Sequence, residues 1–297
     1  MTKYWLDLVR FADTNGIHHD HYRDMTPYRD WVIRAFNQNL PYDDFVTYQL
    51  AGDLFDSPSQ DQLIASGFNR LHLIIDVGTA LPEESYTRNV IDRVTAVGTA
   101  FMGLTVQCAV CHDHKYDPIT AKDFYQLFAF FNNLDGKPET GGRGGMDFQK
   151  GLQPPYISLT TESQQNVLVQ LEDEVSAAQA STKNTQAKID AASDEDAKAT
   201  LQEELKTQQD AQKKIEQELD ALKRSFRYAM VMKERSEPRP AFMLIRGAYD
   251  KPGDEVQRNT PGFLPPMQTS NETPTRMDLA NWMVSSDNPL TSRVAVN

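Results

Sequence analysis

The feature that most constrains the fold is a long, regular repeat in residues 162–226. Apolar or small side chains recur there every three or four residues, and Glu, Lys, Gln and Ala fill most positions between them. This spacing gathers one stripe on a helix face, as in a coiled coil. The stripe comprises Leu168, Leu171, Val175, Ala178, Thr182, Thr185 and Ile189, then Leu201, Leu205, Gln208, Gln212, Ile215, Leu219, Leu222 and Phe226.

A polar turn at Ser193–Asp196 interrupts the repeat once. The sequence therefore predicts an antiparallel coiled-coil hairpin, with arms of about 30 residues, or roughly 45 Å at 1.5 Å per residue. Two interpretations stay open. The hairpin is either a solvated spacer or an arm that docks a protein partner or a second copy of the chain.

Residues 1–150 are predicted to form a helical domain with long loops. Thr26 before Pro27 is typical of an N-cap followed by proline in the first turn. Ser59 and Thr120 each begin a capping-box pattern, and Pro82 opens a helix with acidic residues in its first turn.

Apolar spacing indicates which faces of these helices are buried. The helix after Pro27 is expected to bury Trp31, Phe36, and either Ile33 or the stem of Arg34. The helix after Pro82 is expected to bury Val90, Val94, Val97, Phe101 and Leu104.

The remaining chain divides into shorter segments. The glycine-rich run 139–145 lacks the residues of a phosphate-binding loop and is interpreted as a connector. Residues 227–274 hold two strand-like runs and a proline-rich linker, and residues 275–297 are expected to be the truncated start of a C-terminal domain. The predicted fold class is mainly α.

Composition limits the partners. A net charge of −12 and a pI of about 5.0 argue against nucleic acid and against docking on an anionic membrane. No apolar run approaches the roughly 20 residues of a membrane span. The chain opens with a predicted amphipathic helix, and its first residues do not have the pattern of an export signal. If the protein works outside the cytoplasm, we expect its export signal to be missing from this sequence.

The chemistry centres on Cys108-Ala-Val-Cys-His112. The chain has two cysteines, and both lie in this motif. Cys-x-x-Cys-His is the attachment signature of c-type haem. Cys108 and Cys111 would form thioethers with the porphyrin, and His112 would be the axial iron ligand.

Three alternatives remain open. Cys108 and Cys111 can pair as a redox or structural disulfide. They can bind zinc or another metal with His112 or His114, although a closed zinc site needs four ligands. In the third alternative, Asp113, His114 and Asp117 form a hard-metal or hydrolytic site. Candidates for a sixth haem ligand are His18, His19, His21, His72, Met25 and Met102.

Several runs together resemble the large planctomycete family of cytochrome-c-like domains, whose biochemical role is largely uncharacterised. The resemblance covers nearly all of the chain outside the hairpin. It includes residues Arg239–Gly247, a linker common to these proteins, and the start of a second family domain near Thr275. The main runs are Trp5–Gly16, Tyr28–Asn37, Pro41–Phe45, Gln49–Asp53, Ala65–Phe68, Asp92-Arg93, Gly103–Val106 and Cys108–Ile119.

The resemblance implies an exported haem carrier. The chain departs from the family at residues 76–84, where Asp76-Val-Gly-Thr replaces a common Glu-Gly-Gly before the paired acids. We therefore expect covalent haem c at Cys108, Cys111 and His112, and extracytoplasmic electron transfer to an unidentified redox partner. One alternative is a non-haem metal-binding or hydrolytic module, for which the resemblance implies carbohydrate as a substrate class. The other is an interaction module that uses the hairpin.

Overall fold

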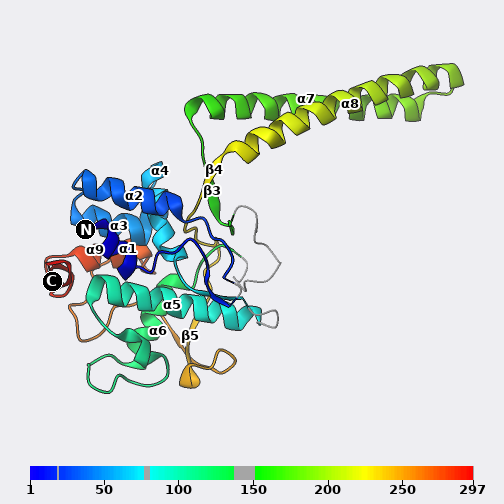
Figure 1. Ribbon diagram of the computed structural model, residues 1–297. Coiled ribbons are helices and arrows are strands. Elements are labelled where there is room, and N and C mark those ends of the chain that lie inside the picture. Colours follow the sequence, from blue (N-terminus) through cyan, green and yellow to red (C-terminus); the bar gives the residue numbers. More distant parts are fainter. Residues whose placement is uncertain (19, 77–80, 137–150, 297) are drawn as a thin grey trace. The chain divides into compact units, whose positions relative to one another are not determined.

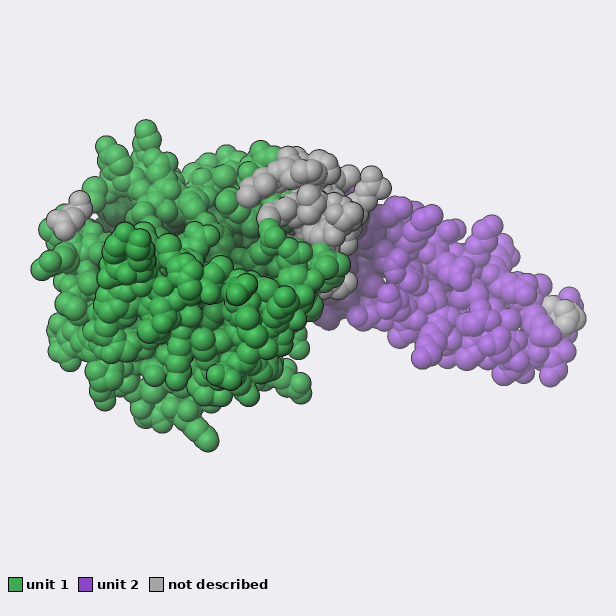
Figure 2. All heavy atoms as spheres, turned by 90° about the horizontal axis from the view of Figure 1, so that it is seen from below, with its two compact units in different colours: residues 1–157, 228–297 green, residues 158–227 purple. Residues whose placement is uncertain are grey.

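The computed structural model describes residues 1–18, 20–76, 81–136 and 151–296. The chain divides into two compact units, which Figure 2 colours separately. Unit 1 comprises residues 1–157 and 228–297, and unit 2 comprises residues 158–227. The predicted mainly α fold is confirmed. The glycine-rich run 139–145 lies outside the described residues.

Unit 1 is built from α-helices, short 3₁₀ helices and small two-stranded sheets (Figure 1). Strands β1 and β2 pair in parallel, and β5 and β6 pair antiparallel. The α-helices are α1 (Thr2–Leu8), α2 (Thr26–Asn37), α3 (Tyr42–Ala51), α4 (Gln60–Ala65), α5 (Pro82–Met102), α6 (Ala121–Phe131), α9 (Arg276–Val284) and α10 (Thr291–Val296). The 3₁₀ helices are η1 (Gly52–Leu54), η2 (Ser66–Arg70), η3 (Val106–Val110) and η4 (Ile245–Gly247). The strands are β1 (Gly16–His18), β2 (Ile74–Asp76), β3 (Tyr156–Leu159), β4 (Arg227–Met230), β5 (Ala241–Leu244) and β6 (Pro252–Val256), and β3 pairs with β4.

An aromatic cluster forms the centre of the core. Trp5 meets Phe45 edge-on at 4.9 Å between ring centroids, and Trp31 stacks on the same ring at 5.3 Å. The polar atoms of these side chains form hydrogen bonds within the core. The indole of Trp5 donates to Tyr28 at 3.1 Å, and the Tyr28 hydroxyl donates to Gln49 at 2.6 Å. These bonds offset the cost of burying polar atoms among apolar rings.

The buried face of α2 differs in part from the prediction. Trp31 is buried as predicted, but Ile33 is 39% exposed and Arg34 points to solvent. Val32 and Ala35 are buried instead, and Phe36 is half-buried. The buried face therefore advances by three and four residues from Tyr28, which is the usual stripe of a surface helix.

Helix α5 buries Val90, Val94, Val97 and Phe101 as predicted. The predicted fifth position, Leu104, lies beyond the helix, which ends at Met102. Gly103 has φ +63°, a left-handed conformation that stops a helix and that glycine adopts without steric cost. The amide of Leu104 then bonds back to the carbonyl of Gly98.

Two of the three predicted N-caps are confirmed. Ser59 and Thr120 form complete capping boxes. Thr26 is the first residue of α2 rather than its N-cap, which is Met25. The capping oxygen belongs to Asp24, whose Oδ1 accepts from the Thr26 amide at 3.0 Å and from its hydroxyl at 2.6 Å.

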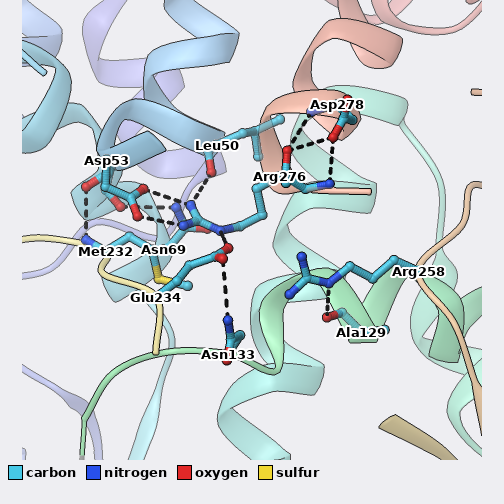
Figure 3. Close-up of polar contacts among 12 residues, drawn as sticks. Leu50, Asp53, Asn69, Ala129, Asn133, Met232, Glu234, Arg258, Arg276 and Asp278 are labelled. Atoms are coloured by element: carbon cyan, nitrogen blue, oxygen red, sulfur yellow. Dashed lines mark hydrogen bonds and ion pairs between the residues drawn. The ribbon is translucent and has the colours of Figure 1, made fainter. Parts of the chain in front are cut away.

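Residues 228–297, which include the segment 275–297 predicted to begin a C-terminal domain, group with residues 1–157 in unit 1. Helix α9 packs on α3, and Arg276 is fully buried between them and Glu234 (Figure 3). Its guanidinium bonds both oxygens of Asp53, at 2.9 and 2.6 Å, and the carbonyl of Leu50 at 2.6 Å. Burial alone would lower the pKa of Arg276, but Asp53 and Glu234 outweigh it and raise that pKa.

Unit 2 consists of α7 (Glu162–Ala191) and α8 (Glu195–Ser225), which lie side by side (Figure 1). The predicted stripe coincides with the least exposed positions of both helices. Two of its polar members meet in the seam, where Thr182 Oγ1 lies 3.2 Å from Gln212 Oε1. Thr185 is 3% exposed, so a hydroxyl occupies a place that an apolar side chain would ordinarily fill.

None of the helices in the described part of the chain combines the length and the apolar character needed to cross a membrane.

Candidate cysteine–histidine site

The Cys-Ala-Val-Cys-His motif spans the end of η3, and three residues separate η3 from the end of α5. Val106, Ala109 and Val110 are buried, whereas Cys108 and Cys111 are exposed free thiols. Cys108 lies within η3, and Cys111 is the residue that follows its last turn.

His112 is exposed, and one of its ring nitrogens is occupied. Its Nδ1 lies 2.7 Å from the carbonyl oxygen of Asp113. A carbonyl only accepts, so Nδ1 is the donor in this contact, and in the neutral imidazole Nε2 is then the nitrogen with the lone pair. Histidines that bind metals commonly donate their second ring N–H to a carbonyl in this way. This bond therefore leaves His112 Nε2 available as a ligand.

Tyr125, on α6, fixes the backbone beneath Cys111. Its hydroxyl donates to the carbonyl oxygen of Val110 at 2.8 Å. Burial, together with the neighbouring Cys111, raises the pKa of the Tyr125 hydroxyl above its usual range. The hydroxyl therefore stays protonated and remains a donor. Sequence reasoning missed this residue, because the aromatic run in α6 shows only that the helix is buried.

The polar residues after the motif hold their own loop together. The carboxylate of Asp113 accepts from the Ala121 amide at 2.8 Å, at the start of α6. His114 Nδ1 accepts from the amides of Tyr116 and Asp117, at 3.3 and 2.8 Å. These bonds give Asp113 and His114 a folding role in this loop. Asp117 Oδ2 lies 3.4 Å from His114 Nδ1, and that nitrogen already accepts from two backbone amides.

The proposed sixth ligands have different surroundings. His72, Met25 and Met102 are almost fully buried, and His21 is half-buried. The carbonyl of His72 accepts from Arg23 at 2.6 Å, which ties this histidine's backbone to the core. The His18 side chain and all of His19 lie outside what the structure describes.

The motif offers two exposed thiols and one imidazole as donor groups. Two exposed thiols and a free imidazole nitrogen are what a c-type haem uses. Among the described residues, no group of three or more His, Cys, Asp and Glu side chains could hold a metal ion. A cavity of about 270 Å³ reaches Gln107, the residue before Cys108, and most of its lining surface is apolar. That lining comprises Leu73, Ser85, Arg88, Asn89, Ile91, Asp92 and Gln107.

The fold and the motif together define a mainly α-helical protein with an exposed Cys-x-x-Cys-His segment. Residues 1–136 match the family model described as "PSCyt2: Protein of unknown function (DUF1549)". The match ends shortly after α6 and includes the whole motif. No curated protein and no solved structure matches the chain.

Proposed function

We propose that this protein carries a c-type haem on Cys108, Cys111 and His112 and transfers electrons outside the cytoplasm. The observation that carries the proposal is the His112 Nδ1 contact with the Asp113 carbonyl. It leaves Nε2 as the ring nitrogen that can bind iron, and the two exposed thiols lie one and four residues earlier in the sequence. The resemblance to planctomycete cytochrome-c-like domains supports the same assignment.

The chain's own residues have separate tasks in this proposal. Cys108 and Cys111 would each add across one vinyl double bond, so that sulfur would bond one carbon and the thiol hydrogen would pass to the other. That addition would consume no external oxidant or reductant. His112 would supply an imidazole nitrogen to the iron, and the Asp113 carbonyl orients its ring. The bound haem would supply a one-electron couple.

The location follows from the chemistry of attachment, because haem c is joined to its protein outside the cytoplasm. The acidic charge of −12 favours a redox partner with a basic surface. The hairpin remains a proposed docking arm for a partner or a second copy of the chain.

The test is a visible spectrum of the full natural protein, exported in a host that matures cytochromes c, and a haem stain after denaturing electrophoresis. We expect a sharp reduced α-band and a stain that survives denaturation. The double variant Cys108→Ala/Cys111→Ala should lose both signals. His112→Ala should lose the low-spin spectrum. Lys115→Ala is the matched control, since Lys115 is an exposed residue of the same loop and provides no ligand.

A colourless, correctly exported protein would overturn the proposal. Oxidised Cys108 and Cys111 in that protein would favour the disulfide alternative, with Asp113, His114 and Asp117 as the polar site. Metal analysis of the same sample would then separate a metal-binding module from one without metal.

A further inference from the structure

The turn at η4 touches the cysteine motif from a distant part of the sequence. Gly247 lies so close to the motif that a Cβ added there would stand 2.9 Å from Cys111 Sγ and 3.0 Å from Val110 Cγ1. Ordinary carbon and sulfur atoms in contact lie farther apart than this. The backbone of Gly247 therefore occupies the space directly beside the Cys111 thiol.

The backbone of this turn is built for that close approach. Arg246 has φ +55° and Gly247 has φ +72°, so two successive residues are left-handed. Glycine adopts this conformation freely, whereas arginine does so at a cost. The turn is closed by bonds from the Ile245 amide to the Lys251 carbonyl, at 2.9 Å, and from the Ala248 amide to the Ile245 carbonyl, at 3.2 Å.

Two contacts therefore constrain Cys111. Tyr125 donates to the Val110 carbonyl, which belongs to the peptide group that precedes Cys111. Gly247 packs against the sulfur itself. Strands β5 and β6 carry the turn and pack on α6, the helix that holds Tyr125. The thiol of Cys111 thus has a defined place even though the residue is exposed.

The geometry points to Gly247 as a positioning residue for the Cys111 thiol, and to the β5–β6 hairpin as part of the cysteine site. The site then extends beyond residues 1–136, which the family model matches. Gly247 limits the positions that the Cys111 sulfur can take. The link to haem attachment rests on the proposed function, whereas the placement of the thiol does not.

The decisive measurement is the alkylation rate of each cysteine in the full, reduced, haem-free chain. Iodoacetamide labels both exposed thiols, and peptide mass spectrometry follows Cys111 and Cys108 separately. In Gly247→Ala, the new methyl group displaces the sulfur toward solvent. We expect the rate at Cys111 to rise severalfold relative to that at Cys108. A general loosening of the fold would raise both rates together.

Two further variants keep the test sharp. Gly247→Asn adds the same Cβ in a residue that tolerates left-handed backbone, so it separates the contact from backbone strain. Gly253→Ala is the matched control in the same hairpin, where a Cβ would meet the Met243 carbonyl at 3.2 Å and not the motif. We expect Gly247→Asn to behave like Gly247→Ala, and Gly253→Ala to keep the wild-type ratio.

An unchanged ratio of the two rates in both Gly247 variants would overturn the inference. Haem staining of exported Gly247→Ala and Gly253→Ala provides the second arm. Lower haem content in the Gly247 variant alone would connect the position of the thiol with attachment. If the wild-type protein carries no haem, the alkylation result still stands, so the two proposals fail independently.

Discussion

Arg276 on α9 and Asp53 on η1 form a buried, two-pronged ion pair although 223 positions separate them in sequence. The Arg276 side chain has no solvent exposure, and that of Asp53 has 6%. Glu234 completes the cluster at 2.9 Å from Arg276 Nε. Three segments of unit 1 therefore meet at one guanidinium.

Removing one member of this cluster should destabilise unit 1 strongly. Asp53→Ala leaves a buried guanidinium short of a counter-charge, which typically costs about 3–5 kcal/mol. Urea unfolding followed by tryptophan fluorescence measures the change. The control is Arg34→Ala, which breaks an exposed pair with Asp61 and should cost about 1 kcal/mol or less. Equal losses in the two variants would contradict the assigned role of the buried pair.

Gly103→Ala should destabilise the protein for two separable reasons. The residue has φ +63°, and its Cβ would lie 2.9 Å from Val294 Cγ2. Left-handed backbone costs a non-glycine residue about 1–2 kcal/mol. Val294→Ala removes the clash but not the backbone strain, so the double variant should recover only part of the loss in urea unfolding. Full recovery would mean that backbone conformation does not matter at this position.

Alkaline pH should weaken the fold through Tyr28. Burial raises the pKa of Tyr28, and the bond from Trp5 only partly offsets this. Above about pH 10, the unfolded chain loses its tyrosine proton while folded Tyr28 keeps it. The stabilising contribution is thus complete below that pH and declines as pH rises above it.

The variant Tyr28→Phe separates this effect from other alkaline changes. It loses the hydrogen bond to Gln49, so it should be less stable at neutral pH. Its free energy of unfolding should fall less steeply than that of the wild type above about pH 10. Urea unfolding at a series of alkaline pH values gives both slopes, and identical slopes would refute the assignment.

The capping box of α6 should contribute modestly to stability. Thr120 Oγ1 accepts from the Asp123 amide at 3.0 Å, and Thr120→Ala should cost about 1 kcal/mol. Thr120→Ser keeps the hydroxyl and should restore most of that. Asp123→Ala should cost more than Thr120→Ala, because Asp123 also accepts from the Gly262 amide at 2.9 Å. Thermal unfolding of the three variants gives the order.

Deleting residues 162–226 tests the hairpin as a docking arm. Unit 1 has its own core, so its urea unfolding should be unchanged when a short flexible linker replaces unit 2. If the arm mediates self-association, sedimentation of the deletion variant should show loss of the larger species. A larger species that persists would exclude the arm as the contact between copies.

The features predicted correctly are those that depend on residues close together in the sequence. The boxes at Ser59 and Thr120 depend on side chains three residues apart, and the hairpin depends on a repeat within each helix. Thr26 was misplaced by one residue because Asp24 and Thr26 are both good capping residues, and only the backbone conformation decides between them.

Contacts between residues far apart in the sequence could not be predicted in this way. Nothing near Arg276 in the sequence indicates Asp53, and nothing near Gly247 indicates Cys111. The α2 helix shows the same limit, since Ile33 and Val32 are equally apolar and packing against other helices decides which is buried. The motif residues Cys108, Cys111 and His112 were identified from chemistry, whereas the contacts that hold them required the fold.

The pairing of Arg276 with Asp53 also bears on how the protein is made. At about 5–20 residues per second, the ribosome adds the 223 residues from Asp53 to Arg276 in roughly 10–45 s. Helices α7 and α8 need only one another and have local contacts, so they can fold within that interval. All of unit 2 is therefore synthesised before α9, so the contact between α3 and α9 can form only after α7 and α8 have been made.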